Sequence, residues 1–260
     1  MQRFSCLIGF LALGTTACAI TLNTPVLRFD SPESQGKLGK GYVAGSFAGD
    51  SDLTIIPDTT AQPPVDSKSY STTVVGAVSS AVGITEGLDL GIFFPASAST
   101  NASGTAPLML EAKYQFLGSH RIERTPGSFA LAATLGLGGA SDSKSDTNSL
   151  NSITANSDSD FEAIDVGAIA GYRWTSWYLL YSGIFFTDYF YSSTIHQSQN
   201  GVPTNNYTFS GNAGQTVLTV GSEFDFGHFV MRLEGAIASG KSGSVNNTDV
   251  FGGGQWGFQW

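Results

Sequence analysis

The chain is dominated by segments in which apolar and polar residues alternate. From about Lys40 onward, ten segments carry an apolar residue at every second position, which is the period of a β-strand. The last segment is the clearest, because Trp256, Phe258 and Trp260 fall on one face and alternate with Gly and Gln. The sequence therefore predicts an all-β chain of about ten strands, with eight as the alternative count.

The two faces of these strands differ in an informative way. In the segment 129–138 the apolar face is opposed only by Ala, Thr and Gly, and in segments such as 108–116 and 164–174 the opposing face also carries a few charges. A soluble sandwich or barrel would instead present an outer face rich in Lys and Glu. Small polar residues suit a narrow lumen, and the apolar face then turns to lipid. The pattern predicts a closed antiparallel up-and-down transmembrane β-barrel.

The expected connections also alternate along the chain. Short turns are predicted at 85–87, 175–176 and 227, with a longer connection at 118–127. Between them we expect long polar loops, at 57–66, 97–104, 141–157, 193–206 and 239–247. Short turns at one end and long hydrophilic loops at the other are typical of bacterial barrels.

With these features, residues 40–260 resemble the superfamily of small bacterial outer-membrane β-barrels. The terminal strand with Trp256, Phe258 and Trp260 resembles the C-terminal aromatic assembly signal of that superfamily. The resemblance implies outer-membrane lipid and the barrel-assembly machinery as partners, and both ends of the mature chain on the periplasmic side. It points to the superfamily and to no particular member.

The first residues predict an export signal. A basic Arg3 precedes a short apolar run from Phe4 to Leu13, which is typical of a secretory signal peptide over residues 1–19. Two cleavage sites fit: after Ala19 by ordinary signal peptidase, or before Cys18 as in a lipoprotein, which would make Cys18 lipidated. Residues 20–39 lack a strand period, and we interpret them as a periplasmic linker or a partial plug.

Charge and composition exclude other classes. The formal net charge is −9, from 12 Lys+Arg and 21 Asp+Glu, and no basic cluster is present, so nucleic-acid binding is not expected. No later apolar stretch is long enough for a membrane helix. Removal of the signal takes away Cys6, so the mature chain has no cysteine pair and no internal disulfide.

Charged residues on the predicted inner face are the main candidates for function. We expect them to meet inside the lower lumen as a network: Asp89, Glu111, Lys113, Asp165, Arg173, Glu223, Asp225, Arg232 and Glu234. Six acids against three bases allow two interpretations. The network is a salt-bridged plug that closes the barrel, since unpaired charges there would be costly, or it lines a small, weakly cation-preferring, porin-like pore.

Other chemistry has weaker support in the sequence. An enzyme would need a titrating base, and the one candidate is His196, predicted on an outer loop near Asp188 and Ser193. The acids between Asp142 and Asp160 lack EF-hand spacing. We therefore predict a structural or surface-interaction barrel that is not an enzyme and has no metal or cofactor; any ligand of the outer loops is unidentified.

Overall fold

The computed structural model describes residues 20–58, 65–96, 107–148 and 153–260. Their regular structure consists of strands: β1 (Ile20–Pro25), β2 (Gly41–Asp58), β3 (Val65–Gly83), β4 (Leu88–Ala96), β5 (Leu108–Leu117), β6 (Ser128–Asn148), β7 (Ile153–Thr175), β8 (Tyr178–Gln199), β9 (Val202–Phe226), β10 (Phe229–Ser242) and β11 (Val245–Gln259). Over these residues there is no helix of the length and apolar character that crossing a membrane requires. Residues 1–19, including Cys18, lie outside the described part.

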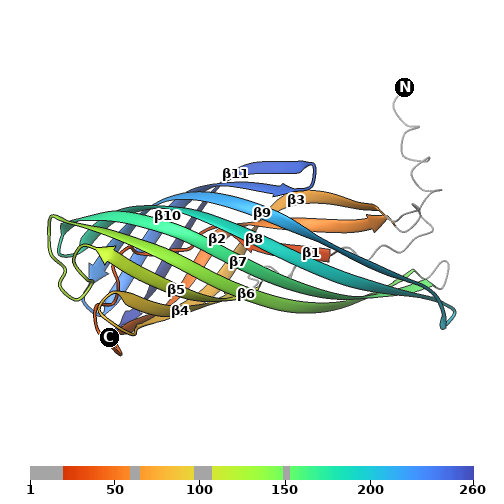
Figure 1. Ribbon diagram of the computed structural model, residues 1–260, viewed down its shortest axis with the longest axis horizontal. Helices are drawn as coiled ribbons and strands as arrows, with labels where there is room; N and C mark the ends of the chain where they lie inside the picture. The colour runs from red at the N-terminus through yellow and green to blue at the C-terminus, as the bar shows by residue number, and fades with distance from the viewer. Residues whose placement is uncertain (1–19, 59–64, 97–106, 149–152) are drawn as a thin grey trace, which may run out of the picture.

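Strands β2 to β11 form a closed ring. Each pairs antiparallel with the next in the chain, and β11 returns to pair with β2 from Gly253↔Ala48 to Gln259↔Tyr42. The predicted all-β, up-and-down architecture with ten strands in the ring is confirmed. Closure leaves no unpaired sheet edge along the paired lengths. Figure 1 shows the strands running together along the long axis of the molecule.

The apolar faces of the strands point outward. Leu110, Trp174 and Val220 are exposed over 59%, 60% and 60% of their surface, although they are large and apolar. Polar and charged residues that alternate with them, such as Lys113 and Arg173, are buried inside the ring. A surface of this kind is stable only against another apolar medium.

The strands differ greatly in length, and three of the five expected long loops are wrong; 97–104 and most of 57–66 lie outside the described residues. Strands β6 to β9 have 21 to 25 residues, about twice the 9–11 needed to span a bilayer. The ranges 141–157, 193–206 and 239–247 belong mostly to strands. Figure 1 shows β6 to β9 extending well past β4 and β5; we call this part the polar extension (residues 141–148, 153–160, 192–199 and 202–210).

Short side chains explain why the polar extension is a sheet. Hydroxyl groups bond across its strand pairs, as from Ser141 to Asp160 at 2.9 Å and from Ser143 to Asp158 at 2.7 Å. The turn between β8 and β9 is the dipeptide Asn200-Gly201, with φ of 50° and 78°. Positive φ at both positions defines the tight hairpin turn that Asn-Gly favours. That dipeptide is the sequence signal that our loop prediction missed.

The two ends of the ring differ in their connections. The turn end carries the connections 84–87, 118–127, 176–177 and 227–228, and at the far end lie the opposite ends of the same strands, with the described turns 200–201 and 243–244. β1 lies toward the far end, paired with Asp50 to Ile55 of β2. Since β3 occupies the other edge of β2, β1 takes the edge that β11 leaves beyond Ala48. Ile20 and Trp260 therefore lie toward opposite ends, contrary to the expectation of a shared side.

Candidate functional site

The candidate site is the lumen, which is filled by the chain's own N-terminal segment. After β1 this segment continues inside the ring to the turn end, where Arg121 N donates to Ser34 O at 2.9 Å and Gly39 N donates to Gly83 O at 3.1 Å. Its residues are buried almost without interruption from Ile20 to Gly36. We call Ile20–Gly36 the plug. The sequence had left linker and partial plug open for this segment, and the structure places it within the barrel.

Apolar contacts hold the middle of the plug. Val26, Leu27 and Phe29 join a buried cluster with wall residues that include Leu179, Tyr181, Phe185, Val217 and Phe251. Phe29 has a φ of 54°, a left-handed conformation that costs a bulky residue on the order of 1–3 kcal/mol. The surrounding contacts must offset that strain.

Polar contacts fix the same stretch of the plug. The backbone N–H groups of Arg28 and Phe29 donate to the two carboxylate oxygens of Glu234, each at 3.1 Å, and Tyr181 Oη donates to the same group at 2.9 Å. The Arg28 guanidinium donates to Asp165 at 2.7 Å and to Thr187 at 3.0 Å. Strands β7, β8 and β10 thus hold one short stretch of the plug.

Glu223 on β9 is the centre of an ion-pair cluster. Its carboxylate accepts from Arg232 at 2.8 Å, from Arg173 at 3.4 Å and from Arg121. Arg173 also donates twice to Glu33 of the plug, at 2.7 and 2.6 Å, the paired geometry in which Arg binds a carboxylate most strongly. Arg232 donates in addition to the Phe29 carbonyl oxygen at 2.9 Å.

A second cluster fixes the lower plug to β4 and β5. Lys113 Nζ lies 3.3 Å from Asp89 and donates to the carbonyl oxygens of Ser31 and Glu33 at 3.0 and 3.1 Å. Asp89 in turn accepts from the backbone N–H of Gln35, at 3.0 and 3.1 Å to its two oxygens. The plug therefore bonds to wall strands on both sides of the lumen.

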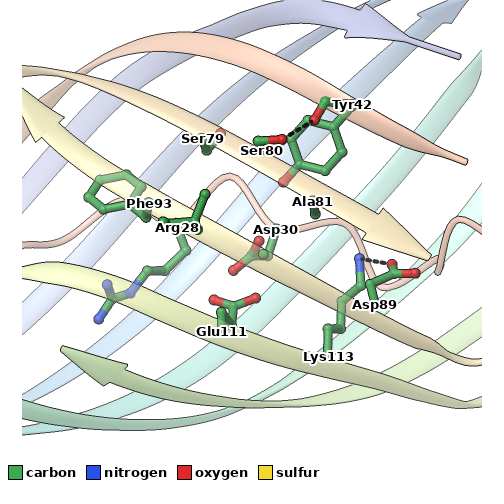
Figure 2. Close-up of a pocket in the computed structure, with 12 residues that line it drawn as sticks. Arg28, Asp30, Tyr42, Ser79, Ser80, Ala81, Asp89, Phe93, Glu111 and Lys113 are labelled. Atoms are coloured by element: carbon green, nitrogen blue, oxygen red, sulfur yellow. Dashed lines mark hydrogen bonds and ion pairs between the residues drawn. The ribbon is translucent and has the colours of Figure 1, made fainter. Parts of the chain in front are cut away.

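One pair of carboxyl groups faces each other beside the plug. Figure 2 shows Asp30 and Glu111 turned toward one another, with Lys113 bonded to Asp89 next to them. Burial raises the pKa of the Asp30 carboxyl. The cavity here measures about 30 Å³, which is room for about one water molecule.

The predicted charged residues all lie on the inner side of the wall, and five of the nine form ion pairs with one another. Within that set the ion pairs are Lys113–Asp89, Arg173–Glu223 and Arg232–Glu223. The remaining four contact residues from other segments: Glu111 with Asp30, Asp165 with Arg28, Glu234 with the plug backbone, and Asp225 with Arg124.

Sequence reasoning missed Arg28, Glu33, Arg121 and Arg124. None of them is in a strand of the ring, since two belong to the plug and two to the 118–127 connection. The signal that could have found the three arginines is the imbalance of six acids against three bases on the wall, because buried acids require cationic partners.

The remaining candidates are the terminal aromatic residues, His196 and the possible metal ligands. Trp256, Phe258 and Trp260 point outward, with 47%, 63% and 51% of their surface exposed. His196 lies on β8, not on a loop, and hydrogen-bonds Asn206 at 2.9 Å. Asp188 is eight residues away along the same strand, about 26 Å at roughly 3.3 Å per residue. Among the described residues no group of three His, Cys, Asp or Glu could hold a metal ion.

Strand pairing and the orientation of the side chains define the class: a closed antiparallel β-barrel with an apolar outer surface and a plug-filled lumen. No family model and no curated protein matches the chain. Among solved structures it is similar to the attachment invasion locus protein Ail of Yersinia pestis, at 12% identity and a TM-score of 0.33, over 86% of this chain and 100% of that one.

Two further solved structures show a similar level of likeness. The outer membrane protease OmpT of Escherichia coli matches at 9% identity and a TM-score of 0.34, over 85% of this chain and 92% of that one. The outer membrane channel DcaP of Acinetobacter baumannii matches at 9% identity and a TM-score of 0.21, over 85% and 96%. At this level of likeness, the fold is defined by the strand pairing of this chain itself.

Proposed function

We propose that this chain is an outer-membrane β-barrel protein with a structural or surface-interaction role, and that its plug keeps the lumen closed to ions. The observation that carries the proposal is the fixation of the plug to the wall by buried ion pairs, Arg28–Asp165 at 2.7 Å and Arg173–Glu33 at 2.6 Å. Lys113 adds bonds from the other side of the lumen. A pore that is open at rest would need a continuous polar path through the lumen, and the plug occupies the lumen.

The outer surface supports the membrane location. Large apolar side chains cover the outside of the ring, and exposed aromatic residues such as Trp174, Trp177, Phe258 and Trp260 lie near the turn end. Amphipathic rings prefer the membrane–water interface. Together with the export signal predicted at the N-terminus, these features favour an outer membrane.

The polar extension supports the surface-interaction role. Ala155 and Ile195 are fully buried and pack with Tyr207 and Phe209, so the extension has a small core of its own. Its outward positions carry hydroxyl and amide groups, as in the Thr194–Thr208 pair at 3.2 Å and the His196–Asn206 pair at 2.9 Å. The extension thus presents a polar surface on a paired sheet.

Ion conductance in a planar lipid bilayer tests the closed lumen. We expect no stable conductance steps from the full chain, and steps from a variant that lacks Ile20–Gly36. A second variant, Leu27→Asp, places a charge in the buried apolar cluster and should give intermittent steps with the plug still attached. Steps from the unmodified protein, or silence from both folded variants, would refute the plug as the seal.

A small passive pore is the second candidate function, and the wall itself favours it. Without the plug, the predicted inner face has six acids and three bases, an excess that favours cations. The same bilayer experiment, run in a KCl gradient, distinguishes the two functions. A conductance of the full chain whose reversal potential is shifted toward the K⁺ equilibrium potential would show that the unmodified protein is a cation-preferring pore.

A further inference from the structure

A cavity of about 400 Å³ opens at the turn end, below the plug. Four separate segments line it: the end of the plug and its continuation, the 118–127 connection, the β9–β10 turn and the end of β11 with the last residue. The lining residues are Gln35, Lys37, Lys40, Arg121, Ile122, Arg124, Gly227, His228, Gln259 and Trp260.

The charge of this cavity is opposite to that of the chain. Its lining includes four Lys and Arg residues and no Asp or Glu, although the whole chain has 12 Lys+Arg against 21 Asp+Glu. One third of all the basic residues therefore line one cavity. Such a concentration attracts anions.

Arg121 and Arg124 are each fixed by contacts with residues of the barrel wall and of the β9–β10 turn. Arg121 bonds to the buried Glu223 and to Gln259 Oε1 at 3.2 Å. Arg124 lies 2.9 Å from Asp225 and donates to Gly227 O at 2.9 Å. These contacts position the guanidinium groups and neutralise part of their charge.

Hydrogen-bond donors remain unmatched around the cavity. Lys37 and Lys40 are exposed, and neither forms an ion pair within the described part of the chain. Their ammonium groups are therefore donors that a ligand in the cavity can reach.

The chemistry of the lining selects the kind of acceptor. Arginine guanidinium groups and lysine ammonium groups are the usual partners of phosphate oxygens. Trp260 and Ile122, both about half exposed, add apolar surface beside the charges. We propose that this cavity is a binding site for a phosphate-bearing anion, either the headgroup of a phospholipid in the adjoining leaflet or a soluble phosphate compound.

Binding to the full-length protein in a neutral detergent tests the proposal, with two probes. Isothermal titration with pyrophosphate measures the soluble source, and native mass spectrometry with phosphatidylglycerol, against a neutral glycolipid, measures the lipid source. The test variant is Lys37→Gln with Lys40→Gln, which leaves the buried pairs intact. The matched control is Lys144→Gln with Lys241→Gln, which removes the same charge near the far end.

We expect the test variant to bind the probe about tenfold more weakly, because it loses charge-assisted contacts from the two lysines. The control variant should bind as the unmodified protein does. Binding of phosphatidylglycerol alone identifies a headgroup site, binding of pyrophosphate alone identifies a soluble ligand, and binding of both supports the shared phosphate chemistry. Binding of neither probe, or equal weakening in test and control variants, overturns the proposal.

Discussion

At the scale of single residues, Glu223 has the most demanding position in the barrel. It is fully buried and accepts from Arg121, Arg173 and Arg232, which come from the 118–127 connection, β7 and β10. A buried charge is stable only while its partners remain. Glu223 therefore links the strands of the wall to the 118–127 segment at the turn end.

Replacing Glu223 by Gln should destabilise the barrel strongly. The substitution leaves three arginines around a neutral side chain, and breaking a buried pair of this kind costs about 3–5 kcal/mol. Urea unfolding in detergent micelles measures the change in the free energy of unfolding. The control is Glu162→Gln, on the exposed face of β7, which should stay within about 0.5 kcal/mol; equal effects would contradict the assigned role of Glu223.

At the scale of elements, the hairpin of β8 and β9 shows how polar sequence forms extended strands. The two strands stay paired from Tyr178↔Phe224 to Gln199↔Val202, with one register irregularity at Gln197/Ser198. The tight Asn200-Gly201 turn fixes this register, since a two-residue loop allows few alternatives.

Replacing Gly201 by Ala should loosen the tip of this hairpin. Gly201 has a φ of 78°, and a Cβ there would have no atom within 4 Å, so the effect is that of the backbone alone, about 1–2 kcal/mol. Hydrogen exchange of the tip amides should become faster. Gly252→Ala is the control, because a Cβ there meets its nearest atom at 3.9 Å without positive φ; unchanged exchange in both variants would count against a strained turn.

At the scale of the whole molecule, the barrel has two unlike ends. The turn end carries the basic cavity and the exposed aromatic residues, and the far end carries the polar extension. We propose that the far end, with its polar extension, lies outside the cell and that the short turns lie in the periplasm.

Epitope tags test this orientation. A short tag at Gly243 and Ser244, in the β10–β11 turn, should be reached by antibody on intact cells, because that turn lies at the far end. A tag between Thr125 and Pro126, at the turn end, should be reached only after permeabilisation. The reverse result would place the polar extension in the periplasm, and two hidden tags would contradict surface exposure.

Several features followed from local pattern alone. Alternation of apolar and polar residues predicted the ring strands and the outward position of residues such as Leu110 and Val220, because a strand turns every second side chain to the same face. The same period placed Lys113 and Arg173 inside. The loops predicted at 141–157, 193–206 and 239–247 were wrong because Ser, Thr, Asn and Asp occur both in loops and in strands exposed to water.

The sequence by itself therefore determined which residues form the wall and which way they face, since both depend on a period of two within one strand. Only the tertiary structure decided what fills the lumen. The plug has no period, and its partners Asp165, Glu234 and Arg173 are more than a hundred residues away in the chain. Contacts over such separations depend on how the closed ring brings strands together, which no local pattern records.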